Sequence, residues 1–186
     1  GYVAGRIGKV FHVPDPKTKL DVELGAPLHK DTALFEDAKT ENDPDDKPHG
    51  TAKGEGFNRA WAASSKPATE FTDYQIASDA ISTLEQFKDK TFFLAVGFIR
   101  PHTPYVAPKP FFDAINKAQF VLPPFYREGG EDVSKMPPSS LRPNNNVFRY
   151  APPTLDEARD ATQAYLAATG FADSQVGRVL AKLKEL

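Results

Sequence analysis

Two segments of the chain carry hydrophobic residues at the spacing of regular structure, and the first predicts a helix followed by a strand. Thr72 or Asp73 can cap a helix that runs to about Lys88. Its apolar positions recur on one face at helical spacing: Ile76, Ala80, Ile81, Leu84 and Phe87. The near-continuous apolar run 91–98 is typical of a strand that is covered on both faces. A helix followed by a buried strand is the unit of an α/β sheet.

The last segment predicts a long helix. Thr154 and Glu157 have the spacing of a capping box, in which each side chain satisfies a backbone N–H group at the helix start. A stripe of mostly small residues follows and indicates close packing against a sheet or another helix: Ala158, Ala161, Tyr165, Ala168, Ala172, Val176, Val179 and Leu183. Gly170 and Gly177 each weaken a helix by about 1 kcal/mol relative to Ala, so we expect them to mark a close approach or a break.

The remaining segments are rich in proline, glycine and polar residues. Residues 1–13 predict a strand, a turn and a loop, and residues 14–67 predict a long excursion with at most short elements. A short helix is predicted to begin near Pro110 and to run through Phe112 and Ile115. Residues 121–153 predict a second Pro-rich loop region. The 17 proline residues imply that much of the chain is extended loop.

The composition is that of a soluble globular domain. A chain of 186 residues is long enough for one ordinary domain with a hydrophobic core. The net charge of -2 argues against nucleic-acid binding, which needs a basic face. No apolar run approaches the roughly 20 residues of a membrane span, so we expect no membrane partner. The absence of cysteine excludes disulfides, thiolate metal sites and cysteine nucleophiles within this chain.

Four residues could carry chemistry. Lys9 and His12 lie three positions apart, just after Gly8, where glycine allows a tight backbone turn. An ammonium group suits an oxyanion, and an imidazole can move a proton near neutral pH. His102 lies just beyond the carboxyl end of the predicted strand, where open α/β sheets bind ligands, and Arg100 beside it could hold an anion. The alternatives are a surface lysine, a loop histidine, a His102 satisfied by backbone carbonyls and an exposed salt bridge of Arg100.

Other clusters favour ordinary structural interpretations. Asp43, Asp45 and Asp46 lack the spacing and the glycine of an EF-hand loop, which favours a solvated acidic loop. His29 and His49 have no partner at metal-ligand spacing. Residues 64–65 are two serines without a recognisable nucleophile context, and no Gly-rich phosphate loop follows a strand.

Several linked motifs resemble the type I sulfatase family. Residues 1–12 resemble its second signature, which reads Gly-Tyr, a few residues, Gly-Lys, one or two residues, an aromatic residue and His, with Ala4 standing where Ser or Thr is usual. The segment 92–108, FFLAVGFIRPHTPYVAP, looks like the strand and His-containing loop of the iduronate-2-sulfatase-like branch. The segments 72–87 and 165–183 also look like that branch.

The resemblance implies a fold and a chemistry. The fold would be α/β, part of an alkaline-phosphatase-like sheet flanked by helices, with long Pro-rich loops. The activity would be hydrolysis of sulfate esters, in which a hydrated formylglycine attacks sulfur and a divalent cation, usually calcium, holds the sulfate. Lys9 would bind the formylglycine and a sulfate oxygen, and His12 would be the base that releases sulfate. His102 would contact the sulfate and protonate the leaving oxygen.

The family's remaining motifs are absent from this sequence. There is no Cys or Ser followed by x-Pro-x-Arg, and the acidic and basic clusters that complete the metal and sulfate site are also missing. We therefore expect residues 1–186 to be an internal part of a sulfatase catalytic domain. We expect this part to contribute no metal ligands. We expect the remaining segments of that domain to be its partners, the isolated chain to be inactive, and some apolar surface to be exposed.

The resemblance also implies a substrate class and a location for the complete protein. The substrate class implied by the resemblance is a sulfated carbohydrate or another sulfate ester. A phosphoesterase or phosphonate hydrolase of the same superfamily and a non-catalytic anion-binding chain are the alternatives. The family's habit implies a secreted, periplasmic or lysosomal location.

Overall fold

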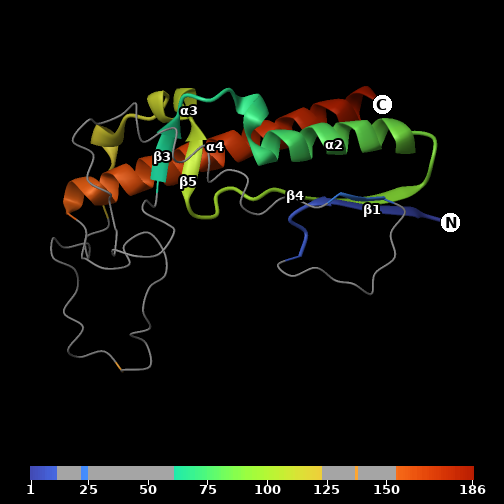
Figure 1. Ribbon diagram of the computed structural model, residues 1–186, viewed down its shortest axis with the longest axis horizontal. Coiled ribbons are helices and arrows are strands. Elements are labelled where there is room, and N and C mark those ends of the chain that lie inside the picture. Colours follow the sequence, from blue (N-terminus) through green and yellow to red (C-terminus); the bar gives the residue numbers. More distant parts are fainter. Residues whose placement is uncertain (12–21, 25–60, 123–136, 138–153) are drawn as a thin grey trace.

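The computed structural model describes residues 1–11, 22–24, 61–122, 137 and 154–186, and its first layer is a parallel sheet. Strand β1 (Val3–Gly8) lies between β2 (Val22–Leu24) and β4 (Phe92–Gly97), in the order β2-β1-β4. The β1–β4 register runs from Val3 opposite Phe92 to Gly8 opposite Gly97. Figure 1 shows both strands alongside helix α2. The strand predicted within residues 1–13 and the strand predicted over residues 91–98 are therefore confirmed.

Helix α2 (Thr72–Phe87) covers one face of this sheet. Ile76 and Ala80 pack with Ile7 of β1, and Leu94 and Val96 of β4 lie against them. Four of the five positions predicted for the apolar face are buried, while Ile81 is half-buried. The predicted cap is wrong, because the helix begins after Phe71 without a side-chain cap hydrogen bond.

Strand β4 is not covered on both faces in the part of the chain that the structure describes. Its residues are mostly half-buried, and the Phe93 side chain is 65% exposed. Leu94 and Val96 contact the core beneath α2, whereas Phe93 lies at the alternate position and faces the other side. A continuous apolar run indicates that a strand lies in a core, but it does not tell which described element covers each face.

A second, two-stranded parallel sheet continues the fold beyond the first. Strand β3 (Trp61–Ser64) pairs with β5 (Tyr105–Pro108). The 3-10 turn η1 (Ala68–Glu70) leads into α2, and α3 (Lys109–Asp113) and η2 (Lys117–Gln119) follow β5. The short helix predicted near Pro110 is thus confirmed, although it ends at Asp113 rather than near Ile115. The loop regions predicted over residues 14–67 and 121–153 lie largely outside the described residues. The described parts of the first region include the short strands β2 and β3.

Helix α4 (Leu155–Glu185) runs along both halves of the molecule. The predicted capping box is confirmed: the Glu157 amide donates to the Thr154 hydroxyl at 3.1 Å, and the Thr154 amide donates to the Glu157 carboxylate at 2.8 Å. The helix is continuous through Gly170 and Gly177, so neither marks a break. A Cβ at Gly170 would meet the Phe111 ring at an ordinary 3.6 Å.

The predicted stripe of α4 is correct in part. The alanines at 158, 161, 168 and 172 are buried, and Val179 packs against the core beneath α2. Tyr165, Val176 and Leu183 are instead exposed. The second core, between α4 and the β3–β5 sheet, is centred on Phe171, whose ring lies 5.1 Å from the Phe71 ring.

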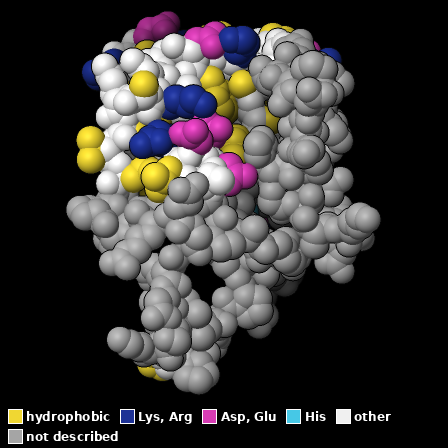
Figure 2. All heavy atoms as spheres, turned by 90° about the vertical axis from the view of Figure 1, so that its left-hand side faces the viewer, with side chains coloured by type: hydrophobic (Ala, Val, Ile, Leu, Met, Phe, Trp, Pro, Cys, Tyr) yellow, Lys and Arg dark blue, Asp and Glu magenta, His cyan; other side chains and the backbone are white. Residues whose placement is uncertain are grey.

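The end of the molecule that carries α3, η2 and the start of α4 has a mixed charged surface. Figure 2 shows Lys or Arg side chains beside Asp or Glu side chains on this face. Lys109 contacts Asp113 at 2.5 Å, and Lys117 pairs with Asp160. Exposed pairs of this kind contribute little to stability. Among the described residues, no helix combines the length and the apolar character that crossing a bilayer requires.

Candidate functional site

The candidate site lies at one edge of the first sheet, where β1 and β4 end side by side. Gly8 is the last residue of β1 and is paired in register with Gly97, the last residue of β4. The Lys9 amide donates to the Gly97 carbonyl at 2.7 Å, so Lys9 leaves the sheet beside the segment that leads to His102. Because parallel strands present their carboxyl ends at the same edge, both segments reach the place where such sheets bind ligands.

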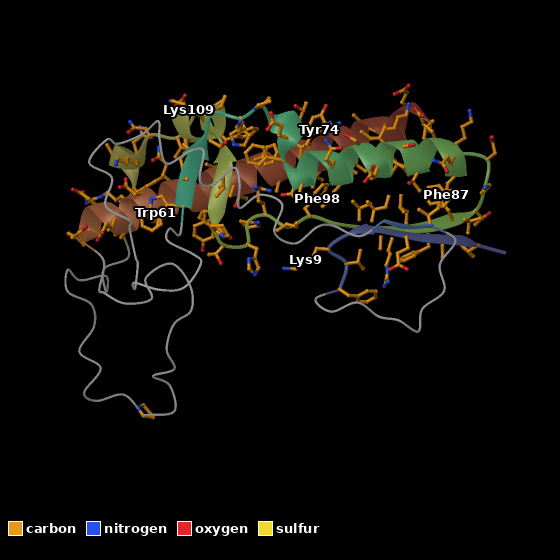
Figure 3. The ribbon with its side chains drawn as sticks, in the orientation of Figure 1. Lys9, Trp61, Tyr74, Phe87, Phe98 and Lys109 are labelled. Atoms are coloured by element: carbon orange, nitrogen blue, oxygen red, sulfur yellow. The ribbon has the colours of Figure 1, made fainter. Side chains whose placement is uncertain are left out.

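Gly8 and Gly97 set the path of the backbone at this edge. Gly8 has a φ of +75°, a left-handed conformation that residues with a Cβ rarely adopt. An added Cβ at Gly8 would overlap the Gly97 carbonyl oxygen, and one at Gly97 would overlap the Lys9 carbonyl group. The tight turn that the sequence predicts after Gly8 is therefore confirmed. In Figure 3 Lys9 projects from the end of β1 on the side away from α2.

His102 is exposed, and its backbone and ring have different partners. The His102 amide donates to the Ile99 carbonyl at 3.0 Å, which makes a turn after β4. Its ring Nδ1 lies 2.6 Å from the Thr103 carbonyl oxygen. A carbonyl only accepts, so this contact assigns the proton to Nδ1 and leaves Nε2 as the atom that can exchange a proton with a ligand. The alternative in which backbone carbonyls satisfy the His102 ring thus holds for one ring nitrogen, Nδ1.

Arg100 is a buried residue whose guanidinium contacts other parts of the chain. Its Nη1 donates to the Asp73 carboxylate at 3.0 Å, and its Nε donates to the Val106 carbonyl at 2.6 Å. The guanidinium carbon lies 4.8 Å from the centre of the Phe71 ring and 5.4 Å from that of Phe171. The exposed salt bridge considered for Arg100 is wrong, since its side chain is 3% exposed. Its substrate contact stays a prediction.

Asp73 and Gly97 are the positions that sequence reasoning missed. The sequence predicts Asp73 as a possible helix cap, yet its carboxylate accepts from the backbone amides of Ile99 and Arg100, at 2.7 and 3.1 Å. No local signal distinguishes such an aspartate from an ordinary cap, because its partners are 26 and 27 positions away. Gly97 could have been noticed as a glycine at the end of an apolar strand, where close backbone approach is common.

The other sequence candidates are placed as follows. His12, His29, His49 and the acidic residues 43–46 lie outside the described residues. Ser64 is fully buried, and its hydroxyl accepts from the Lys66 amide at 3.2 Å. Among the described residues no group of three or more His, Asp or Glu side chains could hold a metal ion.

The electrostatics near the site include one shifted group. Burial raises the pKa of the Tyr105 phenol, and the nearby Tyr165 phenol raises it further. The two rings meet edge to face at 5.5 Å. Tyr105 is the first residue of β5 in the second sheet, three positions after His102, and it stays neutral at physiological pH.

Solved structures identify the class of fold. A phosphonate monoester hydrolase from Silicibacter pomeroyi matches with a TM-score of 0.61 and 19% identity, over 99% of this chain and 42% of that chain. A phosphonate monoester hydrolase of Agrobacterium radiobacter matches with a TM-score of 0.59 and 16% identity, over 99% of this chain and 42% of that one. The α/β, alkaline-phosphatase-like fold predicted from the sequence is thereby confirmed.

The sequence comparison is more specific. Human iduronate 2-sulfatase is 30% identical over 100% of this chain and 36% of its own length. A sulfatase of Formosa agariphila is 30% identical over 99% of this chain and 36% of its own length. The predicted resemblance to sulfatases, and to iduronate 2-sulfatase in particular, is confirmed along the whole chain. The chain spans about a third of the length of these relatives. No family model matches it.

Proposed function

We propose that the protein containing this chain hydrolyses sulfate esters, with a sulfated carbohydrate as the substrate class, and that this chain forms one wall of the active site. One observation carries the proposal: in a chain similar to sulfatases throughout, Gly8 is paired with Gly97. That register supports a site in which Lys9 and the His102 segment act on the same anion.

The chemistry proposed for these residues follows from their types. The Lys9 ammonium would attract a sulfate oxygen and stabilise charge in the transition state. When the ester S–O bond breaks, the departing oxygen takes a proton from Nε2 of a protonated His102. The imidazole that remains then has its proton on Nδ1, in the form that the Thr103 carbonyl favours. His12 is proposed as the base that releases sulfate, as the resemblance implies.

Calcium and formylglycine belong to the proposal only as expectations for the complete enzyme. The described residues contain no cluster that fits a metal ion, so we assign no metal ligand to them. The chain has no cysteine and no Ser-x-Pro-x-Arg sequence to supply the nucleophile. The roles proposed for Lys9 and His102 concern binding and proton transfer, which their own atoms can perform.

Substrate comparison tests the reaction class. The protein containing this chain would be assayed with 4-nitrophenyl sulfate, 4-nitrophenyl phosphate and a nitrophenyl phosphonate monoester. We expect the largest kcat/KM for the sulfate. A larger value for either phosphorus ester would replace the proposal with a phosphoesterase or phosphonate hydrolase. Thermal protection by sulfate, without turnover of any ester, would instead support a non-catalytic anion-binding chain.

Leaving-group dependence tests the role of His102. Nitrophenolate departs without a proton, whereas the alkoxide of an alkyl or sugar sulfate needs one. His102→Gln should therefore lower kcat for the alkyl ester by about 10²–10⁴-fold and lower it much less for 4-nitrophenyl sulfate. Equal losses for both esters would contradict proton donation. Lys9→Met provides the contrast, because losing its charge should weaken turnover of both esters alike.

Two expectations accompany the proposal. The isolated chain of 186 residues should not hydrolyse any sulfate ester above the buffer rate, because its sequence has no nucleophile motif and its described residues contain no cluster that could hold a metal ion. We also propose a secreted, periplasmic or lysosomal location, which rests on the resemblance and which fractionation of the source cells would test.

A further inference from the structure

We propose that Asp73 and Arg100 form a positioning pair that fixes where His102 lies, and that Arg100 acts through His102 rather than on the sulfate. This inference deepens the proposed function and rests on it. It is carried by buried contacts at the two ends of residues 99–106, the segment called here the His102 turn. These contacts do not include the imidazole itself.

The first end of the turn is held by Asp73. Its carboxylate, fully buried in the first turn of α2, accepts from the backbone amides of Ile99 and Arg100, at 2.7 and 3.1 Å. These two amides immediately precede the residues Pro101 and His102. A carboxylate that is shielded from water and accepts from backbone N–H groups makes strong, charge-assisted hydrogen bonds. Asp73 therefore fixes the direction in which the chain leaves β4.

The second end of the turn is held by the Arg100 side chain. Its Nε donates to the Val106 carbonyl at 2.6 Å, so one side chain spans the segment that contains His102. The same guanidinium donates to Asp73 at 3.0 Å. The rings of Phe71 and Phe171 lie near the guanidinium and restrict its position, at 4.8 and 5.4 Å from its carbon. The turn is thus closed between two points that are both anchored in the core.

The imidazole depends on this closure because it has little support of its own. His102 is exposed, and its ring Nδ1 contacts the carbonyl oxygen of the neighbouring residue Thr103. Its position is therefore set by the backbone of the turn. A misplacement of about 1 Å in a catalytic group can cost about 10²-fold in rate. A change that weakens the Asp73–Arg100 pair should consequently lower the rate of proton transfer by His102 while the protein is still folded.

A double-mutant cycle in the protein containing this chain tests the proposal. Arg100→Lys keeps the charge but cannot bind Asp73 and Val106 in the same fork-like way. We expect it to lower kcat for an alkyl sulfate by about 10²-fold while KM changes by less than about 3-fold. In a His102→Gln background, Arg100→Lys should have almost no further effect, since both changes remove the same contribution. Full additivity, or a loss expressed in KM, would indicate a direct substrate contact and overturn the proposal.

Arg178→Lys is the matched control. Arg178 joins α4 to α2 by donating to the Tyr74 carbonyl at 3.2 Å and to the Ser78 hydroxyl at 3.0 Å, and it lies over the Tyr74 ring at 3.8 Å. The same substitution there should reduce thermal stability without changing the leaving-group dependence of kcat. If both variants change kcat in proportion to their loss of stability, Arg100 is merely structural.

A readout that needs no turnover separates this inference from the proposed function. Nitrogen NMR of the labelled histidine ring reports whether Nδ1 or Nε2 carries the proton. We expect His102 to be protonated at Nδ1, and to become a mixture of tautomers in both Arg100→Lys and Asp73→Asn. Unchanged His102 signals in folded forms of both variants would refute the positioning role, even if the protein hydrolyses sulfate esters. Changed signals in a protein without sulfatase activity would leave the positioning role intact and remove the proposed reaction.

Discussion

The substitution of glycine by alanine should have opposite effects at two positions of this chain. Gly8 has a φ of +75°, where a residue with a Cβ is disfavoured by about 1–2 kcal/mol. The added Cβ would also overlap the Gly97 carbonyl oxygen and lie 2.9 Å from the Ile76 Cδ1 atom. Crowding of this kind costs about 1–3 kcal/mol, so Gly8→Ala should lower the free energy of unfolding by roughly 2–5 kcal/mol.

Gly177 provides the matched control. It lies within α4, and a Cβ built there meets no atom within 4 Å. Gly177→Ala should therefore stabilise the protein by about 0.5–1 kcal/mol, because alanine loses less backbone freedom in a helix. The two variants make the same chemical change, so a difference in sign must come from backbone conformation and space.

Urea unfolding followed by circular dichroism measures both effects. With a slope of about 2 kcal/mol per molar, the midpoint should fall by about 1–2.5 M for Gly8→Ala and rise by up to about 0.5 M for Gly177→Ala. An unchanged or higher midpoint for Gly8→Ala would refute the argument that the close approach of β1 and β4 requires glycine. Turnover provides a second check, because a displaced Lys9 should also lower kcat/KM in the complete protein.

Three further predictions concern stability and titration. Thr154→Ala removes the capping box and should lower the unfolding free energy by about 1 kcal/mol, whereas Thr154→Ser should retain most of it in a thermal melt. Phe171→Ala should lower the free energy of unfolding by about 3–5 kcal/mol, and Phe171→Leu should lower it clearly less, because alanine leaves the larger cavity in the packed aromatic core. The Lys182 ammonium lowers the pKa of Glu85 below its ordinary value of 4.5, and the pair raises the pKa of Lys182. The stabilisation by Glu85 is therefore present above its unfolded pKa and lost as pH falls through the lower folded value. In Lys182→Gln the Glu85 pKa should rise toward its ordinary value in a carboxyl NMR titration, and no rise would contradict the pairing.

The regular elements could be predicted because each carries a local pattern. Helix α2 follows from apolar spacing, and α4 follows from its capping box together with its small residues. The buried face of α4 was predicted less well, because the helix is 31 residues long and changes partners along its length. It packs on β5 near Phe171 and on α2 farther along, so one fixed stripe does not describe both contacts. Tyr165 and Val176 lie where the stripe and the real contact face diverge.

The candidate site was predictable as a set of residue types but not as a structure. Lys9 and His102 are recognisable by motif and by their position after strands. The burial of Arg100 is not, because Asp73 and Phe171 reach it from helices distant in sequence. A sequence favours an exposed arginine by default, since few arginines are buried without a partner. Only the folded arrangement, in which α2 brings Asp73 to the segment after β4, reveals that partner.

The pairing of β1 with β4 also has a consequence for the order in which the chain acquires its structure. Val3 and Phe92 are 89 positions apart, whereas Asp73 and Ile99 are 26 apart. Closing the longer loop costs about 1 kcal/mol more chain entropy than closing the shorter one. Contacts between distant residues are also slower to form. We therefore expect α2, β4 and the His102 turn to assemble early, and β1 to dock last. Pulse-labelling hydrogen exchange should then show protection of the Ile99 amide before the Lys9 amide, so the segments that carry His102 and Lys9 would become ordered at different times.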